Sequence, residues 1–253
     1  VTHGGRLICV GGGDETRAFA DVIALQIRDG RVERSALPAL PRPTLKMGGT
    51  VVGDVIYIVG GRDGPNSSTA TRACWALDLS RPTAERRWVG IPDCPGPGRM
   101  MPVVVAAKGA LHVFGGIEIR PDNAGKAKNA APYLRDAWRF VSAARNQPGK
   151  WERLLDLPQP LAGAPSPGWL VDPDTILIFG GVDGAIEAIT DRSSVRSLPG
   201  QILAYHVSDN RWSRAGEMPG AEIRVNAPAV AWRGGYAIIS GEHLPARRTN
   251  ACT

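Results

Sequence analysis

Residues 240–250 carry the side chains whose types and spacing best suit chemistry on a small molecule. Glu242 directly follows a strand-ending glycine, and Arg247 and Arg248 follow a few residues later. A carboxylate can act as a general base, and a guanidinium can hold a substrate carboxylate through two parallel hydrogen bonds. The segment therefore suits proton transfer on an anionic substrate, although a surface ion pair of small energetic value would show the same pattern.

Two further residues are candidates for binding a substrate. Arg99 follows the loop that closes the second repeat of the chain, and Asn226 opens the fifth. Either side chain could point toward the axis of the fold, with a structural or solvent-exposed position as the alternative for each. The histidines are too dispersed, and the cysteines lack the spacing, to predict a metal site.

A repeated strand that ends in a pair of glycines must position these residues. It occurs at 7–12, 55–61, 111–116 and 176–181, and a fifth copy at 237–241 ends in Ser-Gly. The pairs begin at steps of 49, 55, 65 and 60 residues. A strand-Gly-Gly motif with a period near 50 is typical of a kelch blade, and glycine allows backbone angles and close approaches that other residues do not. The sequence thus predicts an all-β, kelch-type β-propeller.

Each repeat also predicts the three other strands of a blade. A shorter apolar strand precedes the glycine-ended strand, and two strands follow it, the last carrying Trp88, Trp151 or Trp212 in three repeats. We expect one propeller domain over 1–253, with blades at 1–46, 47–99, 100–160 and 161–222 and a partial blade at 223–253. Because the chain starts at the first strand of a repeat and ends before a third strand, we expect an incomplete ring of about four and a half blades.

The loop that follows each glycine pair leaves a propeller on the same face. This loop is long at 62–72, 117–136 and 182–201, and 241–250 is its fifth copy. Long loops in compact domains are usually functional or disordered. We therefore expect these loops to share one face, with Glu242 nearer to the axis than the loop tips.

The net charge of +6 comes from 30 basic and 24 acidic residues that are interspersed along the chain. Such mixed charge is typical of a solvated surface, so we expect no nucleic-acid partner, whereas a positive field would concentrate a small anionic substrate. The longest apolar stretches have the length of strands, which predicts no membrane partner. The sequence decides neither the oligomeric state nor the cellular compartment.

Residues 241–249 resemble the Gly-Glu-x-x-Pro-x-x-Arg-Thr segment of bacterial N-acetylneuraminate epimerases, the sialic acid mutarotases built on kelch propellers. The similarity continues through GGTVVGDVIYIVGG, GALHVFGG and NRWSRAGEMPG. The repeat at 1–27 is similar to the last blade of the enterobacterial-type enzyme, yet it precedes the blades that resemble that enzyme's first ones. This order resembles the cyclically permuted mutarotase branch and implies six blades in the complete ring.

The resemblance implies an isomerase that interconverts the anomers of N-acetylneuraminate without a metal or organic cofactor. It maps the family's proton acceptor onto Glu242 and the family's arginine onto Arg248. Arg247 stands where the family often has an apolar residue, which leaves open which arginine faces the substrate. The alternative is a non-catalytic kelch module that binds a protein or a sugar through the same face. Convergence of Glu242 and an arginine on one pocket near the axis would favour the enzyme.

Overall fold

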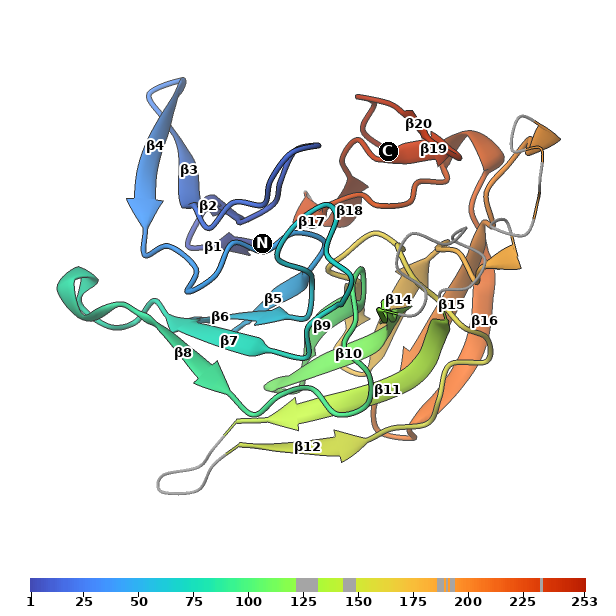
Figure 1. The fold of residues 1–253 in the computed structure, drawn as a ribbon, viewed down its shortest axis with the longest axis horizontal. Helices are drawn as coiled ribbons and strands as arrows, with labels where there is room; N and C mark the ends of the chain where they lie inside the picture. The colour runs from blue at the N-terminus through green and yellow to red at the C-terminus, as the bar shows by residue number, and fades with distance from the viewer. Residues whose placement is uncertain (122–131, 143–148, 186–188, 190, 192–193, 233) are drawn as a thin grey trace.

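The computed structural model describes the chain except residues 122–131, 143–148, 186–188, 190, 192–193 and 233 (Figure 1). The described residues form an all-β fold, with short 3-10 turns at η1 (Thr83–Glu85) and η5 (Gly220–Glu222). No helix among the described residues is long and apolar enough to span a bilayer.

Four antiparallel sheets of four strands follow one another along the chain, and consecutive strands are neighbours within each sheet. Sheet 1 consists of β1 (Thr2–His3), β2 (Arg6–Val10), β3 (Val22–Arg28) and β4 (Arg31–Leu37). Sheet 2 consists of β5 (Gly48–Val52), β6 (Val55–Val59), β7 (Cys74–Asp78) and β8 (Trp88–Ile91). Sheet 3 consists of β9 (Val103–Ala107), β10 (Ala110–Ile117), β11 (Tyr133–Val141) and β12 (Lys150–Arg153). Sheet 4 consists of β13 (Trp169–Asp172), β14 (Thr175–Phe179), β15 (Gln201–His206) and β16 (Arg211–Glu217).

Two hairpins complete the described strands. The first pairs β17 (Ala229–Trp232) with β18 (Gly235–Ile238), and the second pairs β19 (Glu242–Leu244) with β20 (Arg247–Arg248). Figure 1 shows the sheets following one another around a common centre, from blue at the N-terminus to red at the hairpins. Each four-stranded sheet lies within one of the ranges predicted for a blade.

The glycine pairs have a backbone geometry that explains their repetition. The first glycine of each pair has φ between +53° and +68°, and Ser240 takes the same place in the fifth copy with φ of +60°. A Cβ on Gly115 would lie 2.1 Å from the carbonyl oxygen of Leu161. The N–H of Gly116 donates to that same oxygen over 2.8 Å. Glycine takes this left-handed backbone without strain, and at Gly115 the close approach of the segment that leads into the next sheet leaves no room for a Cβ.

A second left-handed position recurs just before the first strand of each later repeat. Lys46, Met101, Gly163 and Asn226 occupy it, with φ of +57°, +54°, +66° and +54°. The N–H of Met101 donates to the oxygen of Lys46 over 2.7 Å, and that of Gly163 to the oxygen of Met101 over 3.1 Å. The N–H of Asn226 donates in turn to the oxygen of Gly163 over 2.7 Å. One backbone hydrogen bond thus sets the spacing of each pair of neighbouring repeats near the axis.

The tryptophans of the fourth strands link neighbouring sheets a second time. Each indole N–H donates to a backbone carbonyl just after the fourth strand of the preceding sheet. The three bonds are Trp88 to Pro38 (2.8 Å), Trp151 to Pro92 (2.8 Å) and Trp212 to Leu155 (3.0 Å). Because the fourth strand lies at the far edge of the sheet from the first, neighbouring sheets are fixed at both edges.

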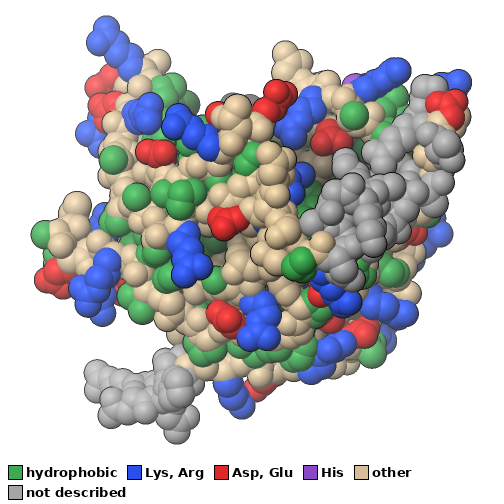
Figure 2. Space-filling view, viewed as in Figure 1, with side chains coloured by type: hydrophobic (Ala, Val, Ile, Leu, Met, Phe, Trp, Pro, Cys, Tyr) green, Lys and Arg blue, Asp and Glu red, His purple; other side chains and the backbone are tan. Residues whose placement is uncertain are grey.

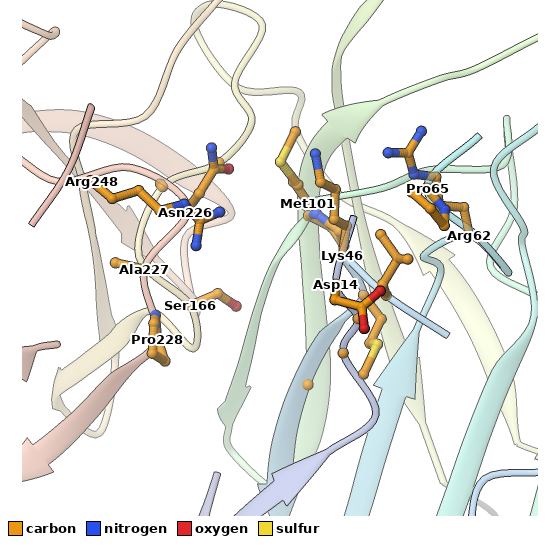
Figure 3. A pocket seen from close by; sticks show the side chains of 18 of the residues that line it. Asp14, Lys46, Arg62, Pro65, Met101, Ser166, Asn226, Ala227, Pro228 and Arg248 are labelled. Carbon is orange, nitrogen blue, oxygen red and sulfur yellow. The ribbon is translucent and has the colours of Figure 1, made fainter. Parts of the chain in front are cut away.

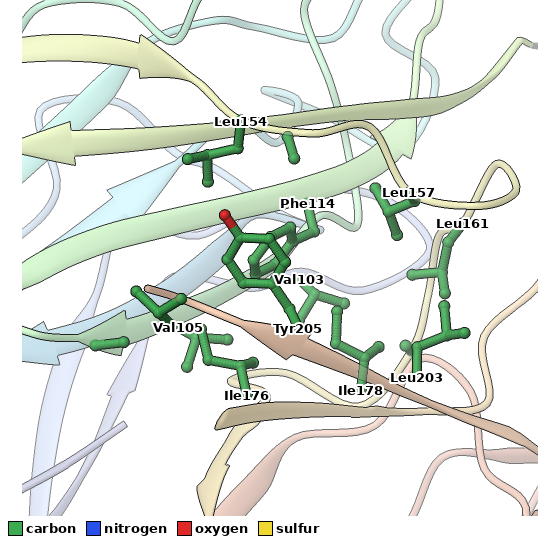
Figure 4. Close-up of a cluster of buried hydrophobic side chains, with 14 residues drawn as sticks. Val103, Val105, Phe114, Leu154, Leu157, Leu161, Ile176, Ile178, Leu203 and Tyr205 are labelled. Atoms are coloured by element: carbon green, nitrogen blue, oxygen red, sulfur yellow. The ribbon is translucent and has the colours of Figure 1, made fainter. Parts of the chain in front are cut away.

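The hydrophobic core is divided among the interfaces between sheets. Each of four buried clusters combines side chains from two successive repeats. In the cluster between sheets 3 and 4, Val103 and Phe114 pack with Ile176, Leu203 and Tyr205 (Figure 4). Burial of apolar surface therefore stabilises each sheet mainly against its neighbours, as expected for a repeat fold.

The first sheet and the β17–β18 hairpin face each other across a hollow of about 970 Å³. Leu7, Ile27 and Val32 line it on one side and Trp232 on the other, with Trp232 61% exposed. This hollow separates the two ends of the row of sheets over the described residues, and the incomplete ring stays a prediction.

Candidate active site

A hollow of about 780 Å³ lies where the glycine-pair loops and the left-handed residues of successive repeats converge (Figure 3). Every repeat contributes to its lining, through Asp14, Lys46, Arg62, Met101, Ser166, Asn226 and Arg248 among others. Its volume lies within the range of about 300–1,000 Å³ that is typical of small-molecule sites. Among the described residues, no group of three or more His, Cys, Asp or Glu side chains is placed to hold a metal ion.

The β19–β20 hairpin places Glu242 and Arg248 opposite each other. The two residues are cross-strand partners, and Ala246 makes the turn with φ of +57°. The N–H of Glu242 donates to the oxygen of Val225 over 2.8 Å, and the N–H of Val225 returns the bond over 2.9 Å. This pair of backbone hydrogen bonds fixes Glu242 beside Asn226, which is the next residue after Val225.

The Glu242 carboxylate is held through one of its two oxygens. The Nδ2 of Asn226 donates to Oε1 over 3.1 Å, and the Nη2 of Arg248 lies 3.9 Å from the same oxygen. The side chain of Glu242 is 21% exposed, and that of Arg248 is 72% exposed. The described residues give Oε2 no hydrogen bond. Asn226 and Arg248 line the hollow, whereas Glu242, which contacts both, is not among its lining residues.

Of the two neighbouring arginines, Arg248 lines the hollow. Arg247, on β20, is exposed and pairs with Leu244 of β19. Because successive side chains of a strand point to opposite faces, the two guanidiniums diverge. The geometry thus favours Arg248 over Arg247 for contact with a ligand in the hollow.

Arg99 occupies a structural position, which does not support the substrate-binding role predicted for it. Its side chain is 0% exposed. Its Nη1 and Nη2 donate to the two oxygens of Asp136 over 2.8 and 2.7 Å, and also to the carbonyls of Gly115 (3.1 Å) and Pro95 (2.9 Å). Trp138 donates a further bond to Asp136 over 2.7 Å. The guanidinium is therefore occupied in fastening the glycine pair of sheet 3.

Asp14 is an acidic side chain that lines the hollow and could also be considered as a base. Its Oδ1 accepts bonds from the hydroxyl of Thr16 (2.6 Å) and from the N–H groups of Thr16 (2.7 Å) and Arg17 (2.9 Å). These bonds, that of the Thr16 hydroxyl first, lower the pKa of Asp14 to about 2. A carboxylate whose basicity is reduced in this way is a poor general base at neutral pH. Glu242 is therefore the stronger candidate.

Arg62 is a residue of the hollow that sequence reasoning missed. It directly follows the second glycine pair, as Glu242 follows the fifth copy. Its N–H donates to the oxygen of Leu45 over 3.0 Å, and the N–H of Leu45 returns the bond over 2.9 Å, as between Glu242 and Val225. This shared offset from the glycine pair was the signal that could have found it.

The expectation that the long loops share one face is met only in part by what the structure describes. Arg62 and Pro65 of loop 62–72 and Arg248 of loop 241–250 line the same hollow. The N–H of Ala70 donates to the oxygen of Ile119 over 3.3 Å, which joins loop 62–72 to loop 117–136. Loops 117–136 and 182–201 contain positions outside the described residues, so their full course stays a prediction.

Charged side chains are interspersed on the face shown in Figure 2. Lys and Arg lie among Asp and Glu around the rim and over the sheets. This face therefore shows no continuous basic patch, and the basic residues expected to contact an anionic ligand are the few that line the hollow.

Known proteins resemble this chain over part or most of its length. The Kelch motif family matches residues 44–95, which contain all of sheet 2. The N-acetylneuraminate epimerase of Haemophilus influenzae is 25% identical over 222 residues, which cover 79% of this chain and 54% of that protein. The N-acetylneuraminate epimerase of Salmonella typhi is 25% identical over 239 residues, which cover 85% of this chain and 57% of that protein. The chain is therefore similar to the kelch-repeat N-acetylneuraminate epimerases over most of its own length.

The chain also resembles a solved structure, that of YjhT. It superposes with a TM-score of 0.63 and 23% identity, over 85% of this chain and 64% of that one. At this identity the likeness shows the fold, and it confirms the predicted kelch-type β-propeller. The chain spans about half the length of the curated epimerases it matches, 54% and 57% for the two above. The cyclic permutation and the six-bladed ring stay predictions.

Proposed function

We propose that the protein is a mutarotase for N-acetylneuraminate or a closely related sugar acid, with Glu242 as the base and Arg248 as the carboxylate anchor. The observation that carries this proposal is the fixed Glu242 carboxylate. Asn226 holds its Oε1 at 3.1 Å, Arg248 lies beside it, and the described residues leave Oε2 without a donor. The names of the related epimerases supply the substrate class.

The proposed reaction needs one base and one carboxylate-binding group because of the chemistry of the sugar. The anomeric carbon of N-acetylneuraminate carries both a carboxylate and a hydroxyl. Oε2 of Glu242 takes the hydroxyl proton while the bond from the anomeric carbon to the ring oxygen breaks and a keto group forms. Water gives a proton to the ring oxygen and is left as hydroxide, which regains that proton when the ring closes. Rotation beside the keto group presents its other face, and the reverse steps close the ring. No net proton, electron or group is transferred.

Arg248 is suited to bind the carboxylate that sits on the same carbon. A guanidinium can make two parallel hydrogen bonds to a carboxylate. The contact of Arg248 with Glu242 is loose, at 3.9 Å, and its side chain is 72% exposed, so the guanidinium is available to a ligand. Asn226 acts as a positioning residue, since it fixes the carboxylate of the base.

The test is the rate of anomer exchange followed by NMR on the protein at its full natural length. Glu242→Gln keeps the size of the side chain but removes the base, so turnover should fall by about 10²–10⁴, with binding little changed. Arg248→Lys keeps the charge but loses the planar fork, so KM should rise. That rise should shrink for a substrate that lacks the carboxylate. Arg247→Lys is the matched control and should leave both constants near the wild-type values.

Two outcomes would overturn the proposal. Exchange at the wild-type rate in Glu242→Gln would show that another group is the base. A wild-type protein that never accelerates exchange, but captures a protein through this face, would identify an interaction module instead.

A further inference from the structure

Arg62 occupies the position in sheet 2 that Glu242 occupies in the last repeat. Both residues directly follow the left-handed pair that ends a strand, with φ of +68° and +96° at Gly60 and Gly61. Both also exchange two backbone hydrogen bonds with the residue that precedes a left-handed position. The repeat geometry that places Glu242 against Asn226 and Arg248 therefore places Arg62 at the equivalent position of another repeat, where it lines the hollow.

Arg62 and Arg248 lie on different walls of the hollow. Figure 3 shows Arg62 with Lys46 on one side and Arg248 with Asn226 on the other. Both sides belong to the same cavity of about 780 Å³, which can hold one monosaccharide. A carboxylate gripped by Arg248 beside Glu242 is therefore not shared with Arg62, so Arg62 must meet a different part of the ligand.

The Arg62 guanidinium is not neutralised by the protein. Its Nε is shielded from solvent and has no hydrogen-bond partner, and among the described residues no carboxylate forms an ion pair with it. Desolvation lowers the pKa of Arg62, which means that its surroundings disfavour the charged form. Arg99, by contrast, is paired with Asp136 through two bonds. A partly desolvated cation in a cavity wall gains most from a ligand that brings oxygen acceptors.

We propose that Arg62 is a substrate-binding residue that donates hydrogen bonds to oxygen acceptors at the end of the sugar acid remote from its carboxylate. In N-acetylneuraminate these acceptors are the amide carbonyl and the side-chain hydroxyls. The proposal rests on the mutarotase function and adds a second point of attachment. With Arg248 at one end and Arg62 at the other, the anomeric carbon is held at Glu242 while the ring opens.

The test compares two ligands in wild type and Arg62→Gln. The first ligand is N-acetylneuraminate, and the second is a shorter 3-deoxy-2-keto sugar acid that lacks both the N-acetyl group and the hydroxylated side chain. Loss of a hydrogen bond to a charged group is worth about 1.5–3 kcal/mol, so Kd and KM for N-acetylneuraminate should rise roughly 10- to 100-fold in Arg62→Gln. The kcat value should change little, because Arg62 does not touch the reacting carbon. For the shorter acid, Kd should stay within about twofold of wild type.

Arg72→Gln is the matched control, because Arg72 lies on the same loop but forms an exposed ion pair with Asp93 at 3.6 Å. It should leave both constants unchanged, and thermal melts should show that both variants are folded. Unchanged affinity of folded Arg62→Gln for N-acetylneuraminate, or an equal loss for both ligands, would overturn the role of Arg62 while leaving the mutarotase function intact. A wild-type protein that neither binds the sugar acid nor accelerates exchange would overturn both.

Discussion

Replacing Asp136 by alanine should leave the guanidinium of Arg99 buried without its counter-ion. Arg99 is 0% exposed and Asp136 is 12% exposed, and two hydrogen bonds of 2.8 and 2.7 Å join them. The indole of Trp138 loses its 2.7 Å bond to the same carboxylate. Removing one partner of a buried ion pair destabilises a protein by about 3–5 kcal/mol, because the remaining charge stays desolvated. We therefore expect Asp136→Ala to lose about that amount.

Urea unfolding followed by circular dichroism measures this loss through the midpoint, provided that the slope m is unchanged. The control is Glu217→Ala, because its pair with Arg214 is exposed by 57% and 67% and should be worth less than about 1 kcal/mol. Arg99→Met combined with Asp136→Ala should recover part of the stability, since no unpaired charge remains. Equal losses in Asp136→Ala and Glu217→Ala would refute the reasoning.

Two further predictions concern buried residues of sheet 3. Burial, with a smaller contribution from the charge of Arg139, lowers the pKa of His112 to about 4. The unfolded chain then binds more protons than the folded one between about pH 6.5 and 4. Lowering the pH through this range should therefore reduce the free energy of unfolding by roughly 3 kcal/mol. A His112→Leu variant should not show this loss in pH-dependent melts. Gly115→Ala should destabilise by more than about 2 kcal/mol, because φ is +58° and the new Cβ would lie 2.1 Å from a backbone oxygen. The control Gly109→Ala, with φ of +70° and open space around it, should cost only about 1 kcal/mol in urea unfolding, and similar losses in both would contradict the packing argument.

Much of the fold could be predicted because the glycine pairs are local signals. Each pair marks the end of a strand, where the backbone turns left-handed. The spacing of these strands can therefore be read directly from the sequence. The start of β11 was harder to place. It begins at Tyr133, inside the loop expected at 117–136, because β10 continues past its glycine pair and Ile117 pairs with Tyr133 after a register shift. The pairing register of two strands that are separated by a long loop cannot be read from the sequence of either strand.

The candidate site was predictable only where it resembles a known segment. Glu242 and Arg248 stand in one short hairpin, so their convergence follows from local structure. The sequence left open whether Arg99 binds a ligand or is structural, because its partner Asp136 lies 37 residues away along the chain and no local pattern joins the two. Lys46 and Met101 were missed as left-handed positions because neither residue type favours that backbone.

The hydrogen bonds that run from Lys46 to Met101, Gly163 and Asn226 are made by peptide groups alone. The register of the repeats around the axis is therefore independent of which side chains project from these positions. Four chemically different residues already occupy equivalent places on one frame. Substitutions at these four positions could therefore change which ligand the hollow prefers, one repeat at a time, while the backbone hydrogen bonds between the repeats stay in place.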